Sequence, residues 1–425
     1  MIERVSLFTS KRDYILFLFI TAFIAIYALL IEYNNYKNLT RFDSNIVDAT
    51  IIKQYTKTKI TKKGKLKSYQ VLKLKSDRGF TFYSSAKKSF PLSIGKEVEL
   101  EIWAGKITFY EYMSSFYAFS KVLNLKSEIG SKEELNSFIQ SQHRDKNIAN
   151  LYQALYTATP LNREFQTKFS TLGVSHLIAI SGFHLGVLSA LLFFLFKYPY
   201  KFFQNRYFPF RSYTLDSFIV IALLLLSYLL FLDSPPSLLR AYTMLIIGFF
   251  LYDRGIKIIS FLTLFLTVVL LISFFPRLLF SIGFWLSVSG VFYIFLFLIH
   301  FKHLSRVWQF VLVPFWVYIF MLPYSIVIFG NFSLYHPLSI LWTTLFTLFY
   351  PLSIALHLIH FGDMFDTLLI SLINLSTTQV PIDIHWKWLI PYIILSVISA
   401  YKKGVLILLF LFAVTIFIYS VYCIA

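Results

Sequence analysis

The 425 residues are 57% hydrophobic and only 14% charged, which excludes an ordinary soluble globular protein and predicts a polytopic α-helical membrane protein. The 39 Lys and Arg outnumber the 21 Asp and Glu, and this net charge of +18 exceeds what membrane topology needs, so it suggests an anionic partner. The surplus is densest in one long hydrophilic stretch, residues 34–150, with 21 basic and 11 acidic residues. Eighteen of those 21 are Lys, and a general bias toward Lys, Phe, Ile, Tyr and Asn would explain the surplus without a ligand.

The first apolar segment, Tyr14 to Ile31, is long enough to cross a bilayer and follows Arg4, Lys11 and Arg12. No small-residue cleavage site follows it, so residues 1–33 are predicted to be an uncleaved transmembrane anchor with a cytoplasmic N-terminus. Residues 34–172 would then lie on the outer side of the membrane.

The hydrophilic stretch reads as short strands separated by glycine turns. The expected strands are 47–55, 68–74, 80–84, 97–104 and 107–112. Five strands in about 70 residues fit a small barrel, so residues 34–112 are predicted to be an external β-barrel domain of OB-like form. Residues 113–150 look helical, and Leu161 to Leu172 forms an amphipathic helix expected to lie in the membrane interface, so 113–172 is interpreted as a helical linker.

Residues 173–425 form the expected multi-span core. Its apolar segments are roughly 176–196, 214–232, 237–252, 257–275, 278–299, 309–329, 336–361, 366–376, 388–400 and 404–423, and several are too short to be simple spans. Lys and Arg recur at 197–211, 254–257, 302–306 and 402–403, as cytoplasmic loops require, whereas the 233–236 loop falls outside.

The segment from Gly173 to Gly186 carries the most informative polar residues. His176, Ser181 and His184 lie within an apolar segment, and Gly182 and Gly186 have the G-x-x-x-G spacing that lets helices pack closely. These residues would form either a helix-packing seam or the lining of a polar path. Arg240 opens a later apolar segment and needs a partner, for which Asp233 and a passing phosphate are the two candidates.

Three of these segments resemble the ComEC family of competence proteins. Leu161 to Gly186 is similar to that family's amphipathic helix and the G-x-S-H-L-x-A-I-S-G-x-H-x-G run after it, and Pro236 to Ala241 is similar to its second landmark. Leu279 to Gly290, which includes Ser287, resembles the third, although Trp285 stands where the family commonly has Gln. The order of anchor, external β-domain and multi-span core also matches. The chain would be a short form without the C-terminal metallo-β-lactamase-like domain of many members.

The resemblance implies an inner-membrane channel that passes single-stranded DNA into the cytoplasm during natural transformation. The translocation path would involve His176, Ser181, Gly182, His184, Gly186, Arg240 and Ser287. Expected partners are single-stranded DNA, membrane lipid, an external DNA receptor and a cytoplasmic motor or DNA-binding protein.

The external domain offers cations interleaved with aromatic residues, the usual means of holding a single strand without sequence preference. The candidates are Lys53, Lys57, Lys59, Lys65, Lys67, Lys73, Tyr55 and Tyr69. A solvated Lys-rich hairpin is the alternative explanation.

Neither a phosphate-binding G-x-x-x-x-G-K-[ST] loop nor an H-x-H-x-D-H metal motif occurs, so we expect no catalytic residue, metal or cofactor. The His300/His303 and His357/His360 pairs are interpreted as helix-end or interfacial. A transporter of polysaccharide or lipid-linked substrates is the alternative function. An intramembrane serine protease built on Ser181 and His184 is a weaker one, since Ala179 replaces a glycine of the G-x-S-G pattern.

Overall fold

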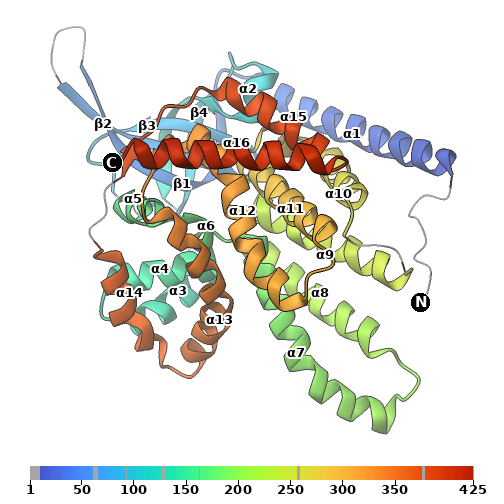
Figure 1. Cartoon of the computed structure of the whole chain (residues 1–425). Coiled ribbons are helices and arrows are strands. Elements are labelled where there is room, and N and C mark those ends of the chain that lie inside the picture. The colour runs from blue at the N-terminus through green and yellow to red at the C-terminus, as the bar shows by residue number, and fades with distance from the viewer. Residues whose placement is uncertain are drawn as a thin grey trace.

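The computed structural model describes residues 10–60, 66–91, 93–125, 131–161, 163–255, 259–375 and 379–424. Within these ranges most elements are helices, and a six-stranded sheet lies at one end (Figure 1). Seven helices, counting the single turn that precedes α13 with that helix, are long and apolar enough to cross a membrane. The chain is therefore a multi-pass membrane protein, as its composition predicts.

The sheet has the strand order β5-β3-β2-β1-β4-β6. Its strands are β1 (Asn45–Ile60), β2 (Leu66–Ser76), β3 (Thr81–Ala86), β4 (Glu97–Trp103), β5 (Phe116–Tyr117) and β6 (Phe119–Leu125). Alternate residues point inward, such as Val98, Leu100 and Ile102 of β4, and they bury an apolar core beneath the sheet. The first four expected strands are thus confirmed, with longer limits for β1 and β2.

Three expectations for this domain are wrong. Residues 107–112 form no strand; instead α2 (Phe109–Ser114) begins there, because Thr108 and Glu111 make a reciprocal capping box. Residues 116–125, expected to be helical, supply β5 and β6. A closed barrel is also not formed by the described strands, since β5 and β6 remain the two ends of the hydrogen-bonded order, although a hydroxyl contact of 2.7 Å joins Ser84 to Ser120.

The anchor α1 (Lys11–Thr40) is fixed to the rest of the chain through an ion pair near its C-terminal end. Glu32 accepts two hydrogen bonds from Arg277, at 2.8 and 2.7 Å, and the guanidinium lies 4.5 Å from the ring centre of Tyr112. Arg277 belongs to a short turn of helix, Pro276–Phe280, after α10. One side chain therefore joins the anchor, the sheet domain and the membrane core.

The core helices follow the apolar segments, with shifted boundaries. They are α7 (Gly182–Tyr207), α8 (Tyr213–Phe231), α9 (Pro236–Asp253), α10 (Phe261–Phe274), α11 (Ile282–His300), α12 (Arg306–Phe329), α15 (Leu389–Ser399) and α16 (Lys403–Tyr422). The expected span 176–196 is wrong at its start, because a separate short helix α6 (Ser175–Ile178) ends before α7 begins.

A second group of helices packs beside this core, at the lower left in Figure 1. It comprises α3 (Ser131–Ser141), α4 (Lys146–Thr157), α5 (Arg163–Thr171), α13 (Ser339–Leu358) and α14 (Asp366–Ile373). Leu161, Phe165 and Phe169 of the predicted amphipathic helix are buried against α4, α13 and α14. Its apolar face thus packs on protein.

Residues between α12 and α15 leave the core and return to the same point. The strands β7 (Asn331–Phe332) and β8 (Val380–Pro381) pair with each other and so bring the two ends of this excursion together. The excursion contains α13, whose leading residue His336 contacts Ser170 and whose last turn contacts His143. Both contacts lie in residues 131–173, so α13 packs along the second group of helices. With its leading turn α13 is also one of the seven helices long and apolar enough to cross a membrane, as the segment 336–361 predicts, whereas α14 has eight residues and is too short to be a simple span.

Candidate functional site

Three distant segments meet where the chain breaks between α6 and α7. Ala179, Ile180 and Ser181 separate the two helices, and the N-terminus of α9 packs against this break, with Ser237 donating a hydrogen bond of 3.0 Å to the Ile180 carbonyl. The third segment is α11, which reaches the same place through Ser287. The three stretches singled out in the sequence are therefore neighbours in space.

Ser181 is the N-cap of α7 and not a residue within a helix, as the expected span 176–196 had it. Its hydroxyl accepts a hydrogen bond from the Phe183 backbone at 3.3 Å, and its own backbone N–H donates to His184 Nδ1 at 3.2 Å. The Ser181 Oγ to His184 Nδ1 distance is 3.1 Å. These are the contacts of a capping box in which His occupies the position usually held by Glu or Gln.

The second ring nitrogen of His184 is the unusual feature. Nδ1 accepts from the Ser181 backbone, so the neutral ring carries its proton on Nε2. Nε2 is buried without a hydrogen-bond partner among the described residues, and the ring lies edge-on to Phe346 and Tyr350 of α13, each at 4.9 Å. The packing of α13 therefore sets the surroundings of this N–H.

Gly182 and Gly186 behave differently from the expected pair. A Cβ on Gly182 would lie 2.9 Å from the Ala241 Cβ and 3.0 Å from Arg240 Nη2, so only glycine lets α7 and α9 approach this closely. A Cβ on Gly186 would meet no heavy atom within 4 Å. The close-packing seam is thus Gly182 alone, and the G-x-x-x-G interpretation is wrong at its second glycine.

Arg240 is a buried cation whose partners are neutral. Its side chain is 4% exposed; Nε donates to Ser287 Oγ at 2.9 Å and Nη1 contacts Met244 Sδ at 3.1 Å. Within the described ranges no ion pair includes it. A buried guanidinium without a carboxylate is costly, so the site has an unmet preference for an anion.

Asp233, the sequence-based candidate partner of Arg240, is engaged elsewhere. Lys132 forms an ion pair with its carboxylate, and Lys75 of β2 donates to its carbonyl at 2.9 Å. Burial lowers the pKa of Lys75, and the Asp233 charge opposes that shift. The loop before α9 is therefore held by the sheet domain and by α3.

The remaining predicted residues of the first motif fix α13. His176 Nε2 lies 3.1 Å from Thr343 Oγ1. Gly173 has a φ of +73°, and a Cβ added there would lie 3.0 Å from His336 Cα. Trp285, which replaces a family glutamine, donates to the Leu279 carbonyl at 2.8 Å and is 41% exposed.

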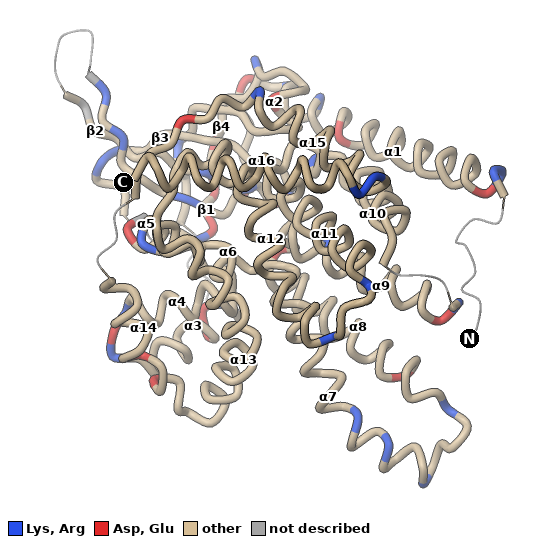
Figure 2. The backbone as a smooth tube through the Cα atoms, viewed as in Figure 1, with Lys and Arg blue, Asp and Glu red and all other residues tan. Residues whose placement is uncertain are grey.

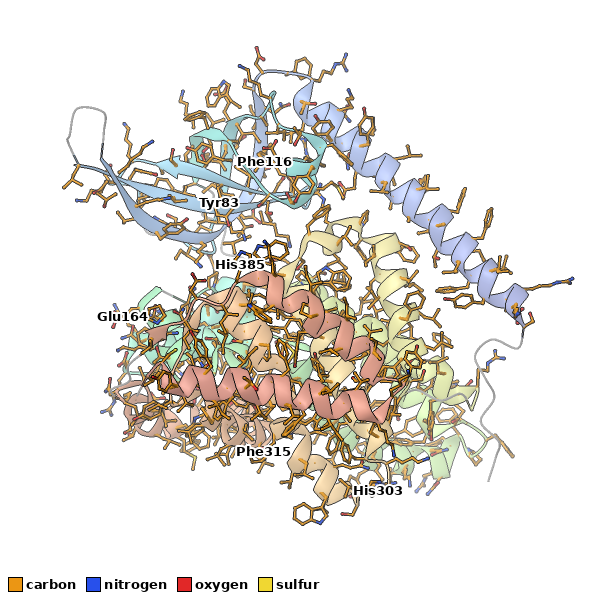
Figure 3. All side chains as sticks on the ribbon, turned by 45° about the horizontal axis from the view of Figure 1, so that its top comes forward. Tyr83, Phe116, Glu164, His303, Phe315 and His385 are labelled. Carbon is orange, nitrogen blue, oxygen red and sulfur yellow. The ribbon has the colours of Figure 1, made fainter. Side chains whose placement is uncertain are left out.

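A groove with a volume of about 980 Å³ crosses the outer face of the sheet. Its charged and aromatic lining is Lys57, Lys59, Lys87, Lys88, Tyr55, Tyr69, Tyr83, Tyr117 and Phe119. Figure 3 labels Tyr83 on this sheet, and the Lys73 ammonium lies 5.5 Å from its ring centre. The register pairs Lys53 with Lys73, so both share the face of Tyr55.

The groove contains four of the eight residues expected for DNA binding: Lys57, Lys59, Tyr55 and Tyr69. Lys65 lies outside the described residues. Lys67 pairs with Lys59 on the neighbouring strand, and only its backbone is among the described parts. Lys87, Lys88, Tyr117 and Phe119 were missed. The alternation of Tyr117 and Phe119 was the available signal, since it places both rings on one face.

Comparison with known proteins gives one match. A family model described as Competence, competence protein, matches residues 158–422, which is more than half of the chain. No curated protein and no solved structure matches. The matched range includes all three segments that meet at Gly182 and Arg240, and it begins after the sheet.

Proposed function

Because this chain belongs to the competence protein family, we propose that it is a channel that passes single-stranded DNA across the inner membrane during natural transformation. The family itself assigns a role in DNA uptake. The observation that carries the finer proposal is the groove on the sheet, where lysines and aromatic rings alternate.

A single strand suits this groove better than a duplex does. Unpaired bases expose flat faces that stack on tyrosine and phenylalanine rings, and each lysine neutralises a phosphate without reading sequence. Tyr55, Tyr69, Tyr83 and Tyr117 come from four different strands, so the rings are spread across the sheet. In the proposed function the open sheet acts as an OB-like binding surface.

The groove side is proposed to face outward. Figure 2 shows Lys and Arg on the C-terminal part of α7 and in the turn to α8, at the end of the molecule away from the sheet. Short loops rich in cations stay in the cytoplasm. The sheet, the 232–235 loop and the N-terminus of α9 then lie on the side from which DNA arrives.

Arg240 is proposed to be the first phosphate contact inside the membrane core. Its fork of donors suits phosphate oxygens, and a transient anion would relieve the cost of a buried unpaired charge. Ser287 and Gly182 hold its position. An external receptor would deliver the strand, and a cytoplasmic motor or DNA-binding protein would pull it.

The first test measures binding by the full chain in lipid nanodiscs. We expect a fluorescent oligonucleotide single strand to bind with an affinity that falls with salt, at a log–log slope of roughly −0.7 per neutralised phosphate. The double variant Lys57→Gln/Lys59→Gln should reduce the slope by about 1.4 units. The double variant Lys96→Gln/Lys106→Gln, at two exposed positions outside the groove lining, is the charge-matched control.

The second test separates binding from passage. Arg240→Gln should abolish delivery of labelled DNA to the cytoplasm while leaving oligonucleotide binding unchanged, and Arg240→Lys should restore part of it. Normal delivery by a correctly inserted Arg240→Gln would refute the role of the guanidinium. Binding of neutral or acidic polysaccharide in place of DNA would favour the alternative transporter.

A further inference from the structure

A buried chain of titratable groups joins α4 to the α13–α14 excursion. His143, just before α4, contacts Asp366 of α14 through Nδ1, at 2.9 and 3.1 Å. Its Nε2 lies 3.0 Å from Nε2 of His357 on α13, and His357 Nδ1 lies 2.7 Å from the Ser353 carbonyl. The His143 side chain has no exposed surface and His357 is 4% exposed. None of these residues belongs to the proposed DNA path.

The donors and acceptors of this chain can be assigned without seeing hydrogens. The Ser353 carbonyl only accepts, so His357 Nδ1 carries a proton, and neutral His357 therefore presents a lone pair at Nε2. His143 Nε2 must then donate to His357. One further proton lies between His143 Nδ1 and the Asp366 carboxyl, on either atom. All contacts are thus satisfied when His357 is neutral and the Asp366–His143 pair keeps at least this one proton.

Removing the proton between Asp366 and His143, or adding a proton to His357, breaks one contact of the cluster. Without the Asp366–His143 proton, either the carboxylate faces a ring lone pair or two ring lone pairs face each other across 3.0 Å. With an extra proton on His357, two N–H groups face each other there. Because the His143 and His357 rings are buried, water does not relieve a mismatch between them, whereas the Asp366 carboxylate is 15% exposed and keeps partial access to water.

The surrounding groups do not supply a substitute charge. Tyr152 stacks on His143 at 4.7 Å and Tyr156 lies edge-on to His357, and burial raises the pKa of both hydroxyls, so they stay neutral. Asp145 and Asp363 act on Asp366 at longer range. The remaining titratable groups nearby, Arg144, Lys146 and His360, are exposed. Burial raises the pKa of Asp366, which His143 opposes, so the pair keeps its proton above the usual range of a carboxyl.

We propose that His143, His357 and Asp366 form a proton-dependent latch that holds the α13–α14 excursion on α4 near neutral pH and releases it on both the acid and the alkaline side. The latch is linked to the candidate site through α13. His357 ends this helix, and Tyr350 and Phe346, two and three turns earlier, enclose the His184 ring. Release of the latch therefore frees the helix that covers His184.

The test follows hydrogen exchange of the full chain in nanodiscs from about pH 4.5 to about pH 9, either side of the ordinary histidine pKa of about 6.5. Protection factors remove the intrinsic pH dependence of exchange. In the native chain we expect protection of residues 354–366 to be highest between the two limits and to fall about tenfold on each side, as loss of one buried hydrogen bond implies.

Two variants each remove one of the two falls in protection. The amide of Asp366→Asn donates to Nδ1 of neutral His143 and has no proton to lose, so only the alkaline fall should disappear. The carbonyl of His357→Gln accepts from His143 and cannot be protonated, so only the acid fall should disappear. Asp363→Asn and His360→Gln, exposed neighbours of the same types, are the matched controls.

A native profile without either fall overturns the latch. So does a profile in which both falls persist in both variants, or in which the controls change it as much as the variants do. If one variant does not insert into the membrane, the other still tests the latch, because each variant is expected to lose a different fall in protection.

Discussion

Gly182→Ala probes the closest approach between α7 and α9. The added methyl carbon would lie 2.9 Å from the Ala241 Cβ and 3.0 Å from Arg240 Nη2, both well inside van der Waals contact. The Ala241 methyl is fixed to a helix backbone, so the helices themselves must separate. Overpacking of this kind costs about 1–3 kcal/mol.

Gly186→Ala is a matched control on the same helix. Its methyl meets no heavy atom within 4 Å, and replacing a helical glycine by alanine gains about 0.5–1 kcal/mol. The free energies of unfolding of the two variants should therefore differ by about 1.5–4 kcal/mol. The measurement is denaturation of the purified chain in mixed detergent micelles, followed by intrinsic fluorescence.

A compensating change identifies the contact responsible. Ala241→Gly removes the opposing methyl, so the double variant Gly182→Ala/Ala241→Gly should be less destabilised than the sum of the single variants, with a coupling of about 1 kcal/mol. Equal stability of Gly182→Ala and Gly186→Ala would refute the close approach. Additive single changes would place the strain on Arg240 instead.

Three further changes test other parts of the structure. Arg277→Gln should raise the protease sensitivity of the sheet domain and destabilise the chain by up to about 3 kcal/mol, because it leaves the partly buried Glu32 carboxylate unpaired and removes the contact with Tyr112. Limited proteolysis measures this change, and an unchanged digest contradicts it. Gly173→Ala should cost about 1–3 kcal/mol in the same denaturation assay, since φ is +73° and its Cβ would lie 3.0 Å from His336 Cα; a neutral effect would refute the strain. Ser181→Asn keeps a helix cap without a nucleophilic hydroxyl, so DNA delivery should be normal in this variant and reduced in Ser181→Ala. Equal loss of delivery in both variants would instead favour a nucleophilic role of Ser181.

Local sequence signals predicted much of the fold. The first four strands follow alternation and glycine turns, and the core helices follow hydropathy. The helix at Phe109–Ser114 was missed because its aromatic residues favour a strand, although Thr108 and Glu111 carried the capping-box signal. The break at Ser181 was missed because His184 replaces the usual Glu or Gln of such a box.

Other features depend on partners far away in the sequence. Hydropathy predicted the α13 segment, but it could not predict the contacts of its two ends with Ser170 and His143, which lie far away in the sequence. Asp233 was assigned to Arg240 by proximity in sequence, but Lys75 and Lys132 reach it from other elements. Residues of the first motif lie close to Arg240 and Ser287, whereas their individual contacts were not predictable from the sequence.

The placement of the excursion also has a consequence for biogenesis. His143 and Asp366 are 223 residues apart, so α3 and α4 emerge from the ribosome long before α14 exists to cover them. At a synthesis rate of about 5–20 residues per second, this interval is on the order of 10–45 s. During that time the apolar face of α4, with Leu151 and Leu155, has no α13 or α14 to pack on. Until α13 and α14 are made, this face has only its near neighbours in the sequence, such as Leu161 and Phe165, to pack on.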